Sequence, residues 1–133
     1  MSELRRILYV EDEPDIRAVT KVALEKIGNF EVKICASGQE ALECAQAFSP
    51  DLFLLDVMMP GMDGPETLTA LREISQLKEI PAMFMTAKIQ VQEVEELKTM
   101  GVIDVISKPF DVLKLSEQLR ESWDRYFKES KSV

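Results

Sequence analysis

The chain has 133 residues, with 16 basic and 24 acidic side chains, a formal net charge of −8 and 46% hydrophobic residues. This length and apolar content suit one domain with a single core. The acidic balance argues against binding to nucleic acid or to an anionic membrane, because phosphate contacts need Lys and Arg. The apolar runs are too short for a signal-peptide core or a membrane span.

Residue counts narrow the chemistry further. The chain has no histidine, which excludes Ser-His and Cys-His catalysis, His-ligated metals and a phosphohistidine on this chain. Its cysteines, Cys35 and Cys44, fall in a predicted strand and a predicted helix, and we interpret them as free thiols in a reducing compartment. We therefore expect a soluble, cytoplasmic protein whose chemistry depends on carboxylates, lysine, hydroxyls and the backbone.

Apolar segments typical of buried strands alternate with amphipathic segments typical of helices. The predicted strands cover residues 7–10, 30–36, 52–55, 81–86 and 102–107, and the predicted helices begin near 14, 38, 64, 91 and 111. The helix near 91–100 has a thin apolar stripe and should be the most exposed. This alternation predicts an α/β, doubly wound, flavodoxin-like fold with a five-stranded parallel sheet in the order 2-1-3-4-5 and helices on both faces.

The chain shows no linker or low-complexity segment. We expect one domain over residues 1–133, with a core from about residue 5 to 127 and a frayed polar tail at 128–133. Trp123, Tyr126 and Phe127 end the last predicted helix with more aromatic rings than one buried stripe needs. Core packing is the favoured interpretation, and a partner or dimer surface is the alternative.

Polar residues stand where the predicted strands end. Asp56 follows the apolar run Leu52–Leu55 and precedes a turn-rich segment. In an open α/β sheet this edge is where ligands bind. Each such residue alone has a structural explanation, as a cap, a solvated charge or a routine strand residue, but their joint occurrence is not required by packing. The set is Glu11, Asp12, Asp56, Thr86 and Lys108.

These residue types together specify a chemistry. Converging carboxylates repel one another, which raises a carboxyl pKa or demands a cation, and oxygen ligands suit Mg²⁺. Lys108 offers a point charge and Thr86 a hydroxyl for phosphate oxygens. Asp56 is a competent nucleophile toward an activated phosphoryl group, giving an acyl phosphate. The residues therefore predict phosphoryl transfer onto Asp56.

Four motifs carry a resemblance to a known family. They are Val10-Glu11-Asp12-Glu13, the stretch from Leu54 to Gly64 (LLDVMMPGMDG), Met85-Thr86-Ala87 and Ser107-Lys108-Pro109-Phe110. In this order and at this spacing the chain resembles the response-regulator receiver domain, the CheY-like family, from about Arg5 to Phe127. The strand order expected above is also that of this family, so it is not independent of the resemblance.

The resemblance implies roles for the site. Asp56 would be the phosphoacceptor, receiving phosphate from a phosphohistidine on a sensor kinase or phosphotransfer protein. Asp12, Asp56 and the Met58 backbone carbonyl would ligate Mg²⁺, with Glu11 nearby through water. Thr86 and Lys108 would bind the phosphoryl group, and the Lys108–Pro109 bond is cis in relatives. Such a domain is not an enzyme on other substrates, since it catalyses only its own phosphotransfer and slow autodephosphorylation.

The sequence departs from the family pattern at two places. Glu11 stands where many relatives have Asp, which should shift the metal geometry slightly. Val105 stands where many relatives carry a switch Tyr or Phe, which puts the usual coupling from Thr86 in doubt and predicts a subtler change. Met58 and Lys88 flank the site and should tune the lifetime of the phosphate.

Other functions remain open from the residues alone. A flavodoxin-like cofactor binder would need a Ser/Thr-rich phosphate loop after the first strand, where this chain has acids. An Asp-dependent phosphatase usually has a second acid two residues on, where Met58 stands. The serious rival is a receiver fold used as a docking module without phosphate signalling. For a receiver, output would come from protein binding through the face of helix 4, strand 5 and helix 5, as a monomer or weak homodimer.

Overall fold

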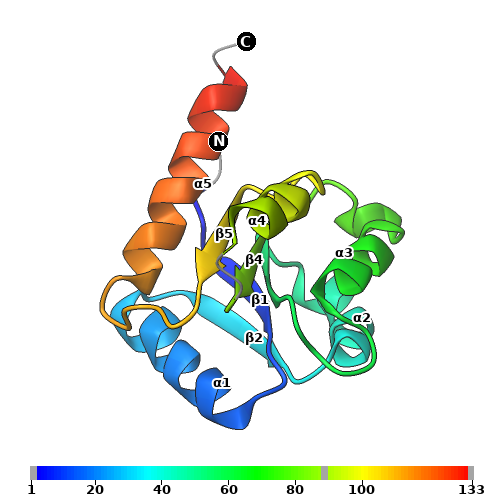
Figure 1. Cartoon of the computed structure of the whole chain (residues 1–133), viewed down its shortest axis with the longest axis horizontal. Helices are drawn as coiled ribbons and strands as arrows, with labels where there is room; N and C mark the ends of the chain where they lie inside the picture. Colours follow the sequence, from blue (N-terminus) through cyan, green and yellow to red (C-terminus); the bar gives the residue numbers. More distant parts are fainter. Residues whose placement is uncertain (1–2, 88–89, 132–133) are drawn as a thin grey trace.

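The computed structural model describes residues 3–87 and 90–131, which form a five-stranded sheet between two layers of helices (Figure 1). The order is β2-β1-β3-β4-β5 and every neighbouring pair is parallel, which confirms the predicted topology. The strands are β1 (Arg6–Val10), β2 (Glu31–Cys35), β3 (Leu52–Asp56), β4 (Ala82–Thr86) and β5 (Asp104–Ser107).

The helices follow the strands in alternation. They are α1 (Pro14–Lys21) continued by a π-helical segment η1 (Val22–Ile27), α2 (Gly38–Phe48), α3 (Gly64–Arg72), a short 3₁₀ turn η2 (Ser75–Leu77), α4 (Val91–Lys98) and α5 (Leu115–Lys131). Within the described residues, no helix is both long and apolar enough to cross a bilayer.

Two apolar cores lie on the two faces of the sheet. Alternate residues of β1 point to opposite sides, so Ile7 and Tyr9 join the core under η1 and α5, whereas Leu8 and Val10 join the core under α2 and α3. Every residue of β3 is buried, because this central strand is covered on both faces. The run Leu52–Leu55 therefore lacks the polar alternation of a half-exposed strand, as its sequence predicted.

Local sequence signals fix several helix starts. Pro14 opens α1, and the Ser37 hydroxyl accepts a hydrogen bond from the Glu40 amide at 3.1 Å, which makes Ser37 the N-cap of α2. In α4, by contrast, no residue is buried and Val91 is 74% exposed. The thin apolar stripe thus correctly predicted a weakly covered helix.

The first helix differs from the regular helix expected to begin near residue 14. Its last six residues wind as a π-helix, and the Gly28 amide donates to the Ala23 carbonyl at 3.2 Å. That carbonyl also accepts the Ser116 hydroxyl of α5 at 2.7 Å. A Cβ atom on Gly28 would lie 2.1 Å from Ser116 Oγ, so the glycine lets α5 approach closely. Periodicity in the sequence does not reveal this long-range contact.

The last helix is displaced relative to its predicted range of 111–127. The Asp111 side chain accepts the Leu113 amide at 2.9 Å and makes a separate turn, so α5 begins only at Leu115. At the other end the helix continues to Lys131, because residues 128–131 contain no glycine or proline to stop it. Within the tail expected to fray, residues 132–133 lie outside the described part of the chain.

Candidate functional site at the carboxyl ends of the strands

The structure brings the predicted polar residues to one edge of the sheet. Asp56 and Thr86 are the last residues of β3 and β4, while Glu11 follows β1 and Lys108 follows β5 directly. Glu11, Asp56 and Thr86 are buried, with exposures of 0%, 3% and 1%. Because parallel strands end at the same edge, segments far apart in the chain supply one cluster.

Lys108 bridges two of the acids. Its ammonium nitrogen lies 2.9 Å from Asp56 Oδ1 and 3.0 Å from Glu11 Oε1. The Lys108 amide also donates to the Thr86 carbonyl at 2.9 Å, which fixes the backbone of the lysine beside β4. A buried carboxylate needs a partner of opposite charge, and one lysine serves both here.

Protein donors surround Glu11. In addition to Lys108, its carboxylate accepts the Tyr9 hydroxyl at 3.3 Å and the Glu13 amide at 3.3 Å. The Tyr9 oxygen in turn accepts the Thr20 hydroxyl at 3.0 Å. The Glu11 side chain is therefore held in place by the protein itself, which suits an indirect role beside a cation better than direct ligation.

Asp56 is energetically unusual. Burial raises the pKa of its carboxyl from 3.8 to about 6, the Lys108 ammonium opposes this change, and the charge of Glu11 adds to it. For Lys108, burial lowers the pKa, but the hydrogen bonds to Asp56 and Glu11 outweigh burial and the net change is upward. The lysine therefore stays charged, while a neutralising cation would favour the ionised form of Asp56.

The donor set fits a divalent cation. Glu11, Asp12 and Asp56 each offer a carboxylate oxygen, and these oxygens lie within 4.8 Å of one another. Asp12 Oδ1 is buried and has no hydrogen-bond partner among the described residues. Three carboxylates facing one ammonium leave excess negative charge, and an oxygen-only set is what Mg²⁺ takes. The residues present therefore fit the predicted metal.

Two residues that sequence reasoning missed hold the first acidic loop. Arg17 donates through Nη1 to the carbonyl oxygens of Glu11 and Asp12, both at 2.9 Å. Tyr9 is the second, through its bond to Glu11. A phenol in a buried strand two residues before an acid was an available signal, because a buried hydroxyl needs a partner. Arg17 had no comparable sequence signal.

The connection after Asp56 is tightly packed. Asp63 and Glu66 form a reciprocal capping box at the start of α3, with bonds of 2.8 and 3.0 Å. The Gly64 amide donates to the Val57 carbonyl at 2.9 Å. A Cβ atom on Gly64 would lie only 2.4 Å from the Asp56 backbone oxygen. Glycine is thus required for α3 to rest against the backbone of the strand end.

Above the cluster the surface is open. A hollow of about 320 Å³ is lined by Asp56, Met58 and Lys108, among others, and the Met58 side chain is 62% exposed. A second hollow, of about 350 Å³, has Thr86 and Met58 on its walls together with residues of α4. A small anion or a partner's side chain can therefore reach Asp56 from solvent.

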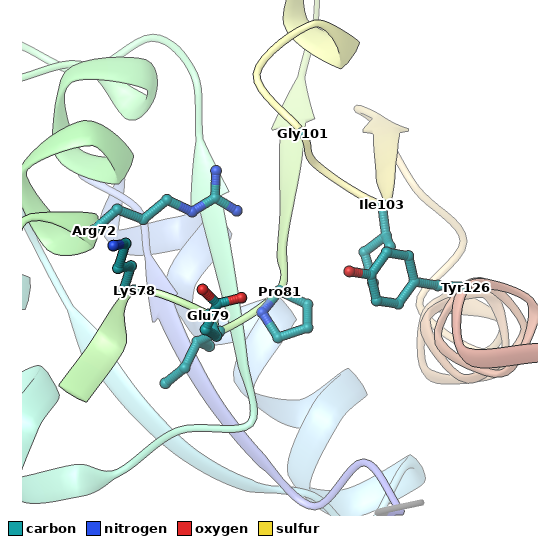
Figure 2. A pocket seen from close by; sticks show the side chains of 8 residues that line it. Arg72, Lys78, Glu79, Pro81, Gly101, Ile103 and Tyr126 are labelled. Carbon is teal, nitrogen blue, oxygen red and sulfur yellow. The ribbon is translucent and has the colours of Figure 1, made fainter. Parts of the chain in front are cut away.

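A larger cavity lies at the opposite edge of the sheet. It has a volume of about 380 Å³, and Figure 2 shows Arg72 and Lys78 across from Tyr126 of α5. Pro81 and Ile103, which directly precede β4 and β5, also line it, so it opens at the strand starts. Its Arg72 already donates to the Met100 carbonyl at 2.9 Å. The cavity is therefore separate from the carboxylate cluster.

Four further predicted features of the site remain: the peptide bond after Lys108, Val105, Lys88 and the Met58 carbonyl. The Lys108–Pro109 peptide is cis, as the resemblance implied. Val105 is half-buried and packs against the core under α2 and α3. Lys88, expected to tune phosphate lifetime, lies outside the described residues. The Met58 carbonyl remains a predicted ligand.

Comparisons with known proteins agree with this geometry. The profile of the response regulator receiver domain matches residues 7–120. "Response regulator Rre1" of Synechocystis is 34% identical over 120 residues, covering 90% of this chain and 52% of that protein. The Bacillus subtilis transcriptional regulatory protein YvrH is 37% identical over 121 residues, covering 91% of this chain and 50% of that protein. The chain thus spans about half the length of these curated relatives.

Solved structures give the same result. The chemotaxis protein CheY4 of Vibrio cholerae superposes with a TM-score of 0.81 at 33% identity, covering 90% of this chain and 98% of that one. A CheY-like receiver domain protein of Methanospirillum hungatei has a TM-score of 0.79 at 29% identity, covering 96% and 99%. With the matching profile and the cluster at the strand ends, these relatives show that the chain belongs to the response regulator receiver domain family.

Proposed function

We propose that this receiver accepts a phosphoryl group on Asp56 from a phosphohistidine of a sensor kinase or histidine phosphotransfer protein. The observation that carries the proposal is the lysine-bridged carboxylate at an open strand end, with Asp12 and Glu11 beside it. Asp56 is the only acid of this cluster that lies in a strand terminus lining the hollow. The chain has no histidine, so the phosphohistidine comes from the partner.

In the transfer step an Asp56 carboxylate oxygen attacks phosphorus as the bond from phosphorus to the imidazole nitrogen breaks. The imidazole leaves on the partner, and an acyl phosphate remains on Asp56. Lys108, already 2.9 Å from Asp56, stays beside the new phosphoryl oxygens as their counter-charge. The Thr86 hydroxyl at the end of β4 donates to another phosphoryl oxygen. These groups act by positioning and by charge neutralisation.

Asp12, Asp56 and the Met58 carbonyl would hold Mg²⁺, with Glu11 acting through water. When bound, the cation neutralises the carboxylates and orients phosphoryl oxygens. The unpartnered, buried Asp12 Oδ1 supports this assignment. Tyr9 and Lys108 both bind the Glu11 carboxylate, which supports an indirect role for Glu11 beside the cation.

Output would pass to a protein target through the surface of α4, β5 and α5, with the domain acting as a monomer or weak homodimer in the cytoplasm. The weak covering of α4 supports this face. Because Val105 is not aromatic, the conformational change that phosphorylation causes on this surface should be subtle. Amide chemical shifts with and without beryllofluoride test this: matching changes in wild type and Val105→Tyr would contradict it.

The first experiment is intact mass after incubation with acetyl phosphate, with and without Mg²⁺. We expect one added phosphoryl group on wild type, dependent on Mg²⁺, and none on Asp56→Asn. Asp15→Asn, an exposed acid of α1 near the same edge, is the matched control and should be phosphorylated normally. Failure of wild type to take up phosphate, Mg²⁺ or beryllofluoride would favour the docking-module alternative.

A further inference from the structure

The two cysteines meet beside the sheet. Cys35 is the last residue of β2 and is fully buried, whereas Cys44 lies in α2 and is partly exposed. Their sulfur atoms are 3.2 Å apart, although nine positions separate them in the chain. Both are free thiols. A partly exposed thiol thus stands in contact with a buried one.

We propose that Cys35 and Cys44 form a redox modification site, at which a low-molecular-weight disulfide such as oxidised glutathione converts the two thiols into an intramolecular disulfide. The sulfurs need to move only about 1 Å closer to reach bonding distance. A small rotation of the Cys44 side chain, whose S–H donates to the Glu40 carbonyl at 3.2 Å, supplies this movement. The structure described here is the reduced form.

The reaction proceeds in two exchanges. Cys44 loses its proton and its sulfur attacks the small disulfide, forming a mixed disulfide and releasing one small thiol that carries the proton. The Cys35 sulfur then attacks Cys44 Sγ, the bond to the small thiol breaks, and the Cys35 proton leaves with the second small thiol. The two protein thiols are oxidised by two electrons, and one small disulfide is reduced to two thiols.

Neither thiol takes part in the proposed phosphoryl transfer, so the site stands independently of it. The bridge would nevertheless form close to the acidic loop, because the Cys35 carbonyl accepts the Glu11 amide at 3.0 Å. It would join the end of β2 to α2, whose Ala41 and Ala45 pack in the same core as Cys35. Both sulfurs belong to one chain, so the expected product is a monomer.

The test uses the reduced 133-residue chain under native conditions with oxidised glutathione, followed by denaturation, alkylation of the remaining thiols and measurement of the intact mass. We expect wild type to lose both alkylatable thiols, to lose the mass of two hydrogens and to carry no glutathione, and dithiothreitol should reverse the change. Digestion after glutamate, which cuts between the two cysteines at Glu40 and Glu43, should leave the peptides that carry Cys35 and Cys44 joined until reduction. This digest of wild type needs no variant that could misfold.

Single variants separate the steps. Cys35→Ala should stop at a stable glutathione adduct on Cys44, and Cys44→Ala should stay unmodified because Cys35 is buried. In wild type, a persistent adduct on Cys44, a disulfide-linked dimer, or two thiols still open to alkylation would each overturn the proposal.

Discussion

The Lys108 ammonium lies 2.9 Å from the Asp56 carboxylate across 52 positions of the chain, and both side chains are largely withdrawn from solvent. The same nitrogen contacts Glu11 at 3.0 Å. One cation therefore compensates two buried acids. This arrangement makes the stability of the domain depend on the charge state of its functional site, which leads to measurable expectations.

Replacing Lys108 with Met should destabilise the fold by about 3 kcal/mol at neutral pH without divalent cations, because two buried carboxylates lose their partner. The loss should shrink as the pH falls below about 6, because the Asp56 carboxyl, whose pKa is raised to about 6, then takes up a proton and no longer needs a cation. Urea unfolding at several pH values measures both effects. Lys114→Met, at an exposed lysine, is the control. Equal stability of the two variants at neutral pH would contradict the role of Lys108 as the stabilising partner of the two buried carboxylates.

Asp56→Asn should make the protein more stable at pH 7 without Mg²⁺, by about 1–3 kcal/mol. The folded-state pKa of about 6 lies above the ordinary 3.8, so the folded protein binds the proton more tightly than the unfolded chain. Wild-type stability should therefore fall as the pH rises from about 4 to 6, and the variant should lose this slope.

Urea midpoints across this range measure the effect, and Asp15→Asn should keep the wild-type slope. Saturating Mg²⁺ should narrow the difference, since the cation stabilises the folded wild type by binding to it. An unchanged slope in Asp56→Asn would show that another group causes the pH dependence.

Asp12→Asn should weaken Mg²⁺ binding by about tenfold or more, equivalent to about 1.4 kcal/mol, because we propose its unpartnered oxygen as a direct ligand. Glu11→Gln should weaken it less, since Glu11 is held by Tyr9, Lys108 and the Glu13 amide. Isothermal titration calorimetry of both variants decides the order. The reverse order would exchange the roles of the two acids.

Gly28→Ala should destabilise the fold by about 1–3 kcal/mol through crowding against α5. The new methyl group would lie 2.1 Å from Ser116 Oγ and 2.6 Å from Ser116 Cβ. Combining it with Ser116→Gly should recover part of the loss, because the two nearest crowding atoms are then removed while the Leu24 carbonyl oxygen stays at 2.9 Å. A double-mutant cycle by thermal or urea unfolding measures this coupling. Purely additive effects would mean that the clash is relieved elsewhere.

Strand order and the gathering of acids were predictable because they follow from alternation and from where strands end. The buried run before it was enough to identify Asp56, and its position directly after the last strand was enough to identify Lys108. The π-helical end of the first helix was not predictable from periodicity, and neither was the bond that its Ala23 carbonyl accepts from Ser116, 93 positions away. The start of α5 was misplaced because the Asp111 turn resembles a helix start in sequence. Local patterns fix elements, whereas these departures come from tertiary contacts or turn chemistry.

The absence of a side chain at Gly64 has a mechanical consequence. The first turn of α3 rests on the peptide of Asp56 at a distance that leaves no room for a methyl group. The capping box of Asp63 and Glu66 stiffens that turn further. We therefore expect the strand end and the helix start to move as one piece, and strain on the aspartate to be relieved on the other flank, at the less covered α4.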